Sequence, residues 1–320
     1  MPRPEHIDPD WIALELLVPR EQAGWRTDRF IAYKIPRLSR TRVQRILETA
    51  AFDSQGRPLK ANRTLPAGER ITIYRPPPQE PETPRDFSVI FEDEWILAVE
   101  KPAGLPVHPT ARFHKNTLTT LLTERYGTPR PALTHRLDAE TSGILLCAHG
   151  REAERRLKIM FAKRRISKRY LAVVFGIPDP PEGRVELPLG LAGAEIRVKM
   201  GVVPDGQPAL TEYRTLATGP TRALVELSPR TGRQHQIRAH LAHLGHPIVG
   251  DKMYGFDERL FLDYIEAGNT PEIHARAGHC RQALHASRLE LIHPFTDEPL
   301  VIESPLPADL VGLHLAGPAV

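Results

Sequence analysis

The chain has 320 residues, a hydrophobic fraction of 41% and a formal net charge of +4, which together indicate a globular protein with a core of its own. Its length favours two domains, and no apolar run approaches the roughly 20 residues needed to span a bilayer. The sequence contains two cysteines, Cys147 and Cys280. So few cysteines in a chain of this length argue against a disulfide framework and for a reducing compartment. We therefore expect a cytoplasmic protein without a membrane segment.

Basic charge is concentrated in two segments of the chain. Residues 25–76 contain 12 Lys and Arg against 4 Asp and Glu, and residues 151–170 contain 9 against 2. Acidic residues gather between these segments, at residues 77–100. Blocks of one sign indicate a polyanionic partner more strongly than a uniformly basic composition would.

The N-terminal basic segment predicts a small domain of two helices followed by strands. Residues 1–14 are expected to form a poorly ordered lead-in, and residues 25–36 predict a short helix. Ser39 suits the N-cap of a second helix over residues 40–50, and strand patterns then continue to Tyr74. Apolar side chains recur on one face of the second helix, and its arginines lie off that face.

This arrangement resembles the S4 RNA-binding module. The matching residues are Arg26, Asp28, Phe30, Leu38, Ser39, Arg40, Val43, Ile46 and the segment 65–68. The turn at residues 49–60 departs from the usual pattern of the module. The resemblance implies RNA contacts through Arg37, Arg40, Arg42 and Arg45. The alternative is an ordinary solvated basic helix face.

The rest of the chain predicts a larger domain after a linker. Residues 77–86 are rich in proline and acid, as a semi-rigid linker would be. The expected strands lie within residues 87–100 and at 144–148, 170–176, 210–217 and 223–228, and the expected helices lie at 151–164 and 236–244, the second stopped by Gly245. Residues 256–281 have no regular pattern, and the segment from Pro305 lacks a strong signal.

Two clusters of polar residues carry the chemistry. His135, Arg136 and Asp138 lie on the loop that leads into the buried strand at 144–148, where binding and catalytic groups tend to be placed. Arg230, Arg233, His235 and Arg238 crowd a strand-to-helix junction, a density of donors that suits phosphate or carboxylate binding. The plain alternative for the first cluster is an Asp that caps a turn beside a solvated Arg136.

The sequence as a whole resembles the RluA-type pseudouridine synthases over residues 15–303. The motifs HRLDAETSGILL, KRYLAVVFG, TGRQHQIRAHLAHLGHPIVGDKMYG and ALHASRL occur in the family's order, preceded by KPAGLPVHP. The resemblance implies an α+β fold: a catalytic domain at 87–304 with a mixed, largely antiparallel sheet, a small S4-like α+β domain at 15–76 before it, and a tail at 305–320. It also implies a monomer that isomerises uridine to pseudouridine in RNA.

The resemblance assigns roles to individual residues. Asp138 matches the catalytic aspartate, and Arg233 matches the arginine that pairs with it and keeps it ionised. Tyr170 matches the aromatic residue that stacks on the uracil. The substrate-binding residues are Arg136, which fills the space left by the flipped base, together with His135 and Arg238. From the residues alone, the arginines could form ordinary salt bridges, Tyr170 could belong to the core, and His135 could hydrogen-bond the loop backbone.

Several alternatives remain open at this level. A carboxylate can attack C1′ or act as a base on the sugar, and the sequence does not choose between the two routes. The histidines lack the paired spacing of zinc sites, so we expect no metal, and an isomerisation without a redox step needs no cofactor. The rivals to the enzyme are a non-catalytic RNA-binding protein and a glycosidic-bond hydrolase. Large-subunit ribosomal RNA is the expected target, with transfer RNA as the alternative.

Overall fold

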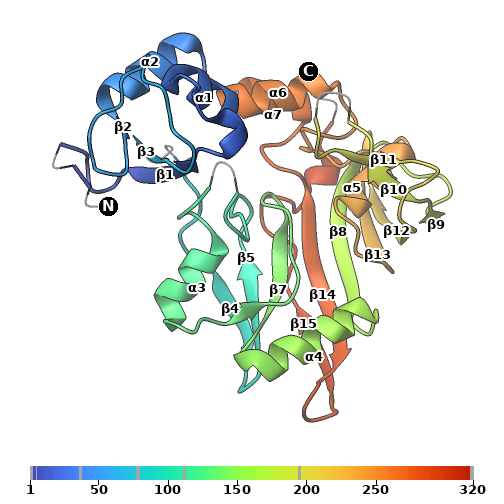
Figure 1. The fold of residues 1–320 in the computed structure, drawn as a ribbon. Coiled ribbons are helices and arrows are strands. Elements are labelled where there is room, and N and C mark those ends of the chain that lie inside the picture. The colour runs from blue at the N-terminus through green and yellow to red at the C-terminus, as the bar shows by residue number, and fades with distance from the viewer. Residues whose placement is uncertain are drawn as a thin grey trace. The chain divides into compact units, whose positions relative to one another are not determined.

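The computed structural model describes residues 3–4, 6–35, 38–76, 80–110, 113–193 and 196–317 (Figure 1). The chain divides into two compact units, Met1–Gln79 and Glu80–Val320. This division falls inside the expected linker at 77–86. In the described ranges, no helix is long and apolar enough to cross a membrane. Arg37 lies outside the described residues, so its expected RNA contact has no structural counterpart here.

The first unit packs two helices on a three-stranded antiparallel sheet of order β1-β3-β2. Its elements are β1 (Ile12–Leu17), η1 (Arg20–Gln22), α1 (Thr27–Lys34), α2 (Arg40–Thr49), β2 (Ala51–Phe52) and β3 (Arg70–Arg75). Phe30, Val43 and Ile71 lie in its core. The Ser39 side chain accepts a hydrogen bond from the amide of Arg42, so the expected N-cap is confirmed.

The expectation of a poorly ordered lead-in at residues 1–14 is wrong for its last part. Strand β1 begins at Ile12 and pairs with β3 along its whole length, from Ile12 opposite Arg75 to Leu17 opposite Arg70. An edge strand of this kind is stabilised by a partner far along the chain. Local sequence patterns therefore give no sign of it.

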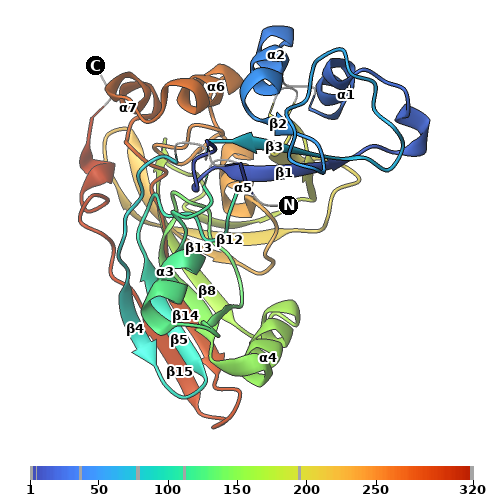
Figure 2. The ribbon, with the colours of Figure 1, turned by 60° about the vertical axis from the view of Figure 1, so that its left-hand side comes forward.

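The second unit is organised around a ten-stranded mixed sheet (Figures 1 and 2). Its main path runs β4-β5-β7-β14-β8-β13-β12-β9, with β6 paired to β7 and β15 paired to β14. These strands are β4 (Ser88–Glu92), β5 (Ile96–Lys101), β6 (Ala132–Leu133), β7 (Ser142–Ala148), β8 (Ser167–Phe175), β9 (Glu182–Glu186), β12 (Leu210–Thr218), β13 (Arg222–Pro229), β14 (Leu284–Ile292) and β15 (Pro299–Glu303). The pairing of β7 with β14 is parallel and the others are antiparallel. The expected mixed, largely antiparallel sheet is confirmed.

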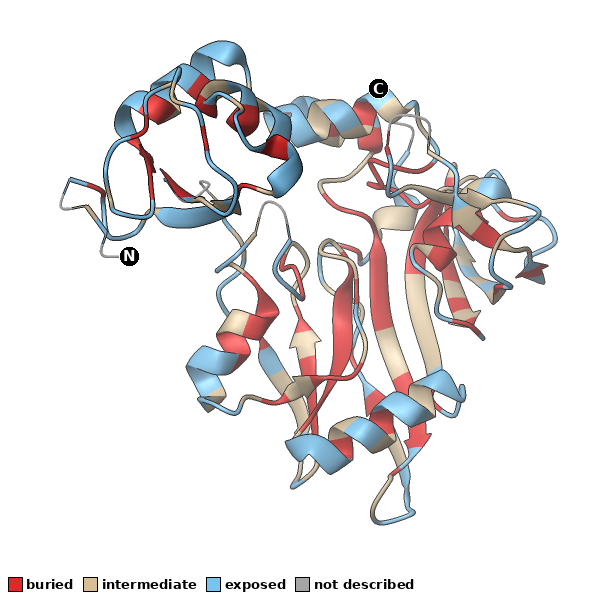
Figure 3. Ribbon diagram, in the orientation of Figure 1, coloured by how far each residue is buried: buried red, intermediate tan, exposed pale blue. Residues whose placement is uncertain are grey.

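Strand β7 is buried on both faces (Figure 3). Leu145 and Cys147 pack with α3 (Leu118–Tyr126) on one side, and Ile144 and Leu146 pack with α4 (Gly150–Ala162) on the other. A strand buried on two sides reads as a continuous apolar run rather than an alternating one. The apolar run before Ala148 is explained in this way.

Close approach of β7 and β14 requires glycine at the entrance to β7. Gly143 has φ +107°, and a Cβ atom there would lie 2.2 Å from the carbonyl oxygen of Ala286. No side chain fits in that space. The loop that carries Asp138 therefore enters the sheet directly against β14.

The remaining elements include segments that have no clear pattern in the sequence. Residues 256–281 contain α6 (Glu258–Ala267) and α7 (Pro271–Ala277), and a separate two-stranded sheet pairs β10 (Leu189–Leu191) with β11 (Met200–Val202). Helix α5 (Gln236–His243) ends before Gly245, which has φ +83°, as expected. The segment from Pro305 is more than a tail, because Leu310 is fully buried in the core beside β8 and β13 and is followed by η2 (Leu313–Leu315).

Candidate active site

The loop before β7 places Asp138 in the lining of a pocket. Two donors fix the carbonyl oxygen of Ala139, the next residue: the amide of Gly104 at 2.8 Å and the Nζ atom of Lys101 at 2.9 Å. The amide of Thr141 closes the turn by donating to the carbonyl of Asp138 at 3.2 Å. The backbone next to the Asp138 carboxylate is therefore held by the loop that follows β5.

Lys101, the last residue of β5, is fully buried. Its ammonium also donates to the carbonyls of Pro102 at 2.7 Å and Leu105 at 2.9 Å. Burial lowers the pKa of Lys101 to about 7, although the charge on Asp138 opposes the shift. With all three N–H groups directed at carbonyl oxygens, the side chain ties the KPAG loop to the Asp138 loop.

A second set of contacts holds the far end of the Asp138 loop. The Glu140 carboxylate accepts from Lys252 at 2.8 Å and from the amide of Gln282 at 3.0 Å. The Gln282 side chain donates to the hydroxyl of Thr141 at 2.6 Å. Arg281 reaches the carbonyl of Glu140 and also forms a two-point ion pair with Asp309. The C-terminal segment thus supports the Asp138 loop through Arg281.

Arg238 is the residue that pairs with Asp138. Its Nη1 atom donates to Oδ2 of Asp138 at 2.7 Å, while Nε and Nη2 donate to Asp251 at 2.7 and 2.9 Å. The expectation that Arg233 forms this pair is therefore wrong. The Arg233 side chain donates to the carbonyl of Pro208 instead. Sequence reasoning misses Asp251, although it lies in the GDKMYG segment beside the basic motif.

The pair keeps Asp138 ionised. Burial raises the pKa of the Asp138 carboxyl, but the charge and hydrogen bond of Arg238 outweigh it and leave the pKa below its usual value. Burial likewise acts to lower the pKa of Arg238, and the carboxylates of Asp251 and Asp138 more than offset this. The Asp138 side chain keeps 24% of its surface exposed toward the pocket. It is a carboxylate that is charged, oriented and accessible.

His235 and Tyr254 complete the shell around the pair. The hydroxyl of Tyr254 accepts from the amide of Met200 and can donate to Nδ1 of His235 at 3.0 Å. This arrangement leaves the ring proton on Nε2, which lies 3.9 Å from Oδ1 of Asp138. Burial, and then the neighbouring Arg238, lower the pKa of His235 to about 4, so the ring is neutral at physiological pH. Arg238 is consequently the cation that balances Asp138.

The loop before α5 owes its shape to Gln236. The side-chain oxygen of Gln236 accepts from the hydroxyl of Thr231 at 2.6 Å and from the backbone amide of Arg233 at 3.0 Å. Its side-chain NH2 group donates to the hydroxyl of Thr211 at 2.9 Å. His235 adopts a left-handed conformation, with φ 53°, directly before the helix. These features start α5 at a fixed point and place Arg238 in its first turn.

Tyr170 lies on β8 and lines the same pocket as Asp138. Its ring packs against two of the core clusters of the second unit. Burial, followed by the charge on Asp138, raises the pKa of the Tyr170 hydroxyl well above its usual value. The side chain is therefore a neutral phenol at physiological pH.

His135 and Arg136 are adjacent in sequence but differ in environment. The Nε2 atom of His135 accepts a hydrogen bond from the amide of Leu146 at 2.9 Å, and its ring lies 4.6 Å from that of Phe161. Burial lowers the pKa of His135 to about 3, so it is a neutral loop anchor, the alternative considered from the sequence. Arg136 is exposed and lines the pocket, with no side-chain partner in the described part of the chain.

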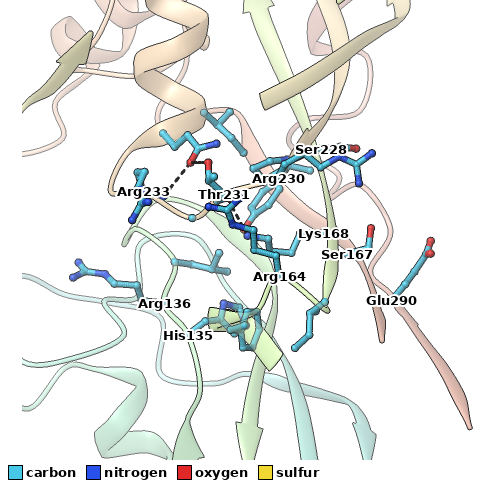
Figure 4. Close-up of a pocket in the computed structure, with 18 of the residues that line it drawn as sticks. His135, Arg136, Arg164, Ser167, Lys168, Ser228, Arg230, Thr231, Arg233 and Glu290 are labelled. Atoms are coloured by element: carbon cyan, nitrogen blue, oxygen red, sulfur yellow. Dashed lines mark hydrogen bonds between the residues drawn. The ribbon is translucent and has the colours of Figure 1, made fainter. Parts of the chain in front are cut away.

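The pocket containing these groups has a volume of about 1010 Å³. Figure 4 shows Arg136 and Arg233 at one side, with Arg164 and Lys168 nearer the middle. The Lys168 ammonium donates to the carbonyl of Thr231 at 3.2 Å. Small-molecule sites usually measure about 300–1,000 Å³, so this pocket is at the upper end of that range. Within the described ranges, no three His, Cys, Asp or Glu side chains are grouped to hold a metal ion.

This fold and site define a class of enzymes that rearrange a nucleoside in RNA. Residues 95–243 match the family model described as RNA pseudouridylate synthase. A protein from Chloroflexus aurantiacus named as an uncharacterized RNA pseudouridine synthase is 40% identical over 304 residues, which cover 92% of this chain and 90% of the relative. The chain belongs to the RNA pseudouridine synthase family and is an enzyme of that class.

Further relatives agree with this membership. The ribosomal large subunit pseudouridine synthase D of Nitrosomonas europaea is 35% identical and is covered to 86%, with 94% of this chain aligned. The solved structure of human RNA Pseudouridylate Synthase Domain Containing 4 is 29% identical, covers 71% of this chain and 92% of its own, and has a TM-score of 0.56. The family and fold expected from the motifs are confirmed.

Proposed function

We propose that this enzyme isomerises uridine to pseudouridine in large-subunit ribosomal RNA, with Asp138 as the catalytic carboxylate. The observation that carries the assignment is the ionised Asp138 side chain, bonded to Arg238 at 2.7 Å and exposed in a pocket that also contains Tyr170. Relatives named for the large ribosomal subunit support the choice of target. The alternative target is transfer RNA.

In the reaction, the bond between N1 of uracil and C1′ of the ribose breaks, and a bond between C5 and C1′ forms. The proton on C5 leaves, and N1 gains one, so the composition of the nucleotide does not change. Asp138 either attacks C1′ or removes a proton from the sugar, and a charged carboxylate serves both routes. Arg238 holds the carboxylate in position and keeps it ionised.

The other pocket residues bind and orient the nucleotide. Tyr170 stacks on the uracil as a neutral ring. Arg136 fills the space that the flipped uridine leaves in its RNA stack, which offsets part of the few kcal/mol that flipping costs. Arg233 lines the pocket without bonding to Asp138, and it contacts the RNA backbone rather than the carboxylate. In this proposal the enzyme is a cytoplasmic monomer that needs no metal or cofactor.

The first unit acts as an S4-like RNA-binding domain in this proposal. Arg40, Arg42 and Arg45 are exposed on α2, and among the described residues none of them has an ion-pair partner. On α1, the guanidinium of Arg29 lies 4.3 Å from the ring centroid of Trp25. An exposed basic helix of this type suits phosphate contacts.

A pseudouridine map of cellular RNA tests the function directly. Total RNA from cells with and without the gene would be treated with carbodiimide and examined by primer extension, with an Asp138→Asn strain alongside. We expect a site in large-subunit ribosomal RNA that is lost in the deletion, restored by the wild-type gene and not restored by Asp138→Asn. Because Asn has nearly the same volume as Asp, the variant should still fold and bind RNA.

Each other outcome would support a different alternative function or target. A modification site lost from transfer RNA would change the proposed target and leave the proposed reaction unchanged. Release of free uracil in place of pseudouridine would indicate a hydrolase. An unchanged map across all RNA classes would favour a non-catalytic RNA-binding protein, and activity retained by Asp138→Asn would remove Asp138 from its assigned role.

A further inference from the structure

The pocket extends beyond the catalytic centre to the end of the sheet. The turn between α4 and β8 contributes Arg164, Arg165 and Ile166, and the β14–β15 hairpin contributes Ile292 and Val301. Ser167 lies opposite Glu290 in the pairing of β8 with β14, and Val301 lies opposite Glu290 in the pairing of β14 with β15. The turn and the hairpin are therefore direct neighbours. We call this part of the pocket, formed by 164–166, 291–292 and 299–301, the side lobe.

Two unpaired cations line the side lobe. Arg164 and Arg165 are exposed, and the described structure gives neither guanidinium a hydrogen bond or ion pair. By contrast, Arg155, Arg156 and Lys158 on the preceding helix are bonded to Glu152 or Glu154. Arg164 also has φ 57°, a left-handed conformation uncommon for a residue with a side chain. This conformation ends α4 in a common helix cap, in which the amide of Arg165 donates to the carbonyl of Met160 at 2.9 Å, and it turns the chain toward β8.

The hairpin adds an exposed apolar surface beside these cations. Ile292 is 50% exposed and Val301 is 48% exposed, and Pro299, opposite Ile292 in the ladder, is exposed as well. Glu290, the acidic residue of the pocket next to the lobe, is already paired with Arg288 at 2.5 Å and Arg169 at 3.5 Å. The lobe therefore presents an apolar shelf and a net positive charge, and it opens directly into the catalytic pocket.

We propose that the side lobe binds the unpaired nucleotides next to the target uridine, with their phosphates on Arg164 and Arg165 and a base on the shelf of Ile292, Pro299 and Val301. This inference rests on the proposed function, because it takes RNA as the substrate. Continuity with the catalytic pocket requires an occupant attached to the uridine, and the two free guanidinium groups require an anionic one. A single RNA strand meets both conditions, since it is read through unstacked bases and a charged backbone.

The test uses RNA that contains every possible target. Total RNA from a strain that lacks the gene would be labelled with tritium at C5 of uridine, and isomerisation would release the tritium to water. Two variants remove the features of the lobe: Arg164→Gln with Arg165→Gln, and Ile292→Ser with Val301→Ser. The matched controls are Arg151→Gln with Arg155→Gln, on α4 but outside the pocket, and Ile177→Ser with Leu216→Ser, which are both 45% exposed elsewhere on the surface.

We expect both lobe variants to raise the RNA concentration for half-maximal rate about tenfold, through lost phosphate contacts in one and a lost base contact in the other, with a rate at saturation within about twofold of wild type. The arginine variant should also reduce the slope of log affinity against log salt by about 1.4, or about 0.7 for each single-strand phosphate that is no longer neutralised. Thermal unfolding of each variant would check that the fold is intact. Lobe variants that behave like their controls would overturn the inference. Failure of the wild-type protein to release tritium would instead contradict the proposed function.

Discussion

The Nη1 atom of Arg238 lies 2.7 Å from Oδ2 of Asp138, and the rest of that guanidinium is held by Asp251. Because Asp251 is fully buried, Arg238 cannot be removed without leaving an unpaired buried charge. We expect Arg238→Lys to lower kcat by about 10²-fold, since a lysine cannot bridge two carboxylates and small misplacements are costly. Urea unfolding should show a loss of about 3–5 kcal/mol for Arg238→Ala. Arg233→Lys is the control, and an equal loss of kcat there would contradict the pairing.

Lys101 should act as a positioning residue for the Asp138 loop. Replacing Lys101 by Met leaves the carbonyls of Pro102 and Leu105 without this donor, at a cost of about 1–3 kcal/mol for each buried group left unsatisfied, and leaves Ala139 bonded to the amide of Gly104 alone. We expect a lower free energy of unfolding together with a reduced kcat and little change in KM. Lys163→Met, at an exposed lysine after α4, should change neither quantity. A Lys101→Met enzyme with wild-type kcat would rule out the positioning role.

The neutral state of Tyr170 predicts how substitutions act. Tyr170→Phe keeps the ring and should leave the Kd for RNA within about twofold, whereas Tyr170→Ala should weaken binding by about 1–3 kcal/mol, the usual effect of losing one base-aromatic stack. Binding would be measured in the Asp138→Asn background, so that turnover does not interfere. If Phe and Ala weaken binding equally, the hydroxyl rather than the ring makes the important contact.

Two partly buried histidines, His135 and His235, should make the fold sensitive to mild acid. The folded pKa of His235 is about 4 and that of His135 is about 3, against roughly 6.5 in the unfolded chain. As the pH falls below the pKa of the unfolded chain, the unfolded state binds protons before the folded state does. The free energy of unfolding therefore decreases, by about 1.4 kcal/mol per pH unit for each histidine. Denaturant titrations between pH 7 and pH 4.5 should therefore show a steady loss of stability.

Substitution isolates the contribution of His135. His135→Gln can still accept the hydrogen bond from Leu146 but does not titrate, so its stability should fall less steeply between pH 6.5 and pH 4.5 than that of the wild type. His243→Gln, at the exposed end of α5, provides the comparison. The Asp138 carboxylate affects stability only at lower pH, because its stabilising charge is lost as the pH falls through its depressed pKa. If the free energy of unfolding fell equally steeply with pH in the wild type, His135→Gln and His243→Gln, the contribution assigned to His135 would be contradicted.

The RNA-binding role proposed for the first unit predicts a change in salt dependence. Replacing Arg40, Arg42 and Arg45 by Ala should weaken RNA binding and flatten the plot of log affinity against log salt, by about 0.7–0.9 for each phosphate that these arginines neutralise. The rate at saturating RNA should stay close to wild type, since these residues are in the other unit from Asp138. An unchanged slope would mean that this face of α2 does not contact phosphates.

Parts of the site and fold could be predicted from the sequence, because their signals are local. The cap of α2 at Ser39, the buried strand β7 and the position of Asp138 before it all follow from patterns a few residues long. The short helices α6 and α7 also carry ordinary signals, with Asp257 and Thr270 as N-caps and Gly268 and Gly278 at the ends. They are hard to recognise because each amphipathic pattern covers only two or three turns.

The partner of Asp138 could not be predicted in the same way. Arg233 and Arg238 are both about a hundred residues from Asp138 and lie in one motif, so the spacing does not distinguish them. What selects Arg238 is the start of α5 after His235 and the buried carboxylate of Asp251, which is on the segment after the helix. The start of the helix at Gln236 is predicted by the residue pattern, but the burial of Asp251 and its bonds to Arg238 are not visible in it.

The position of β14 has a consequence for how the enzyme is made. This strand lies between β7 and β8 in the sheet, although it is the second-last strand in the sequence. Asp138 precedes β7 and Tyr170 lies on β8, so the strand that joins the two halves of the site leaves the ribosome more than a hundred residues after both of them. Sheets built from such distant pairings form slowly. A nascent chain halted before Leu284 should therefore carry every catalytic side chain and still lack an active site.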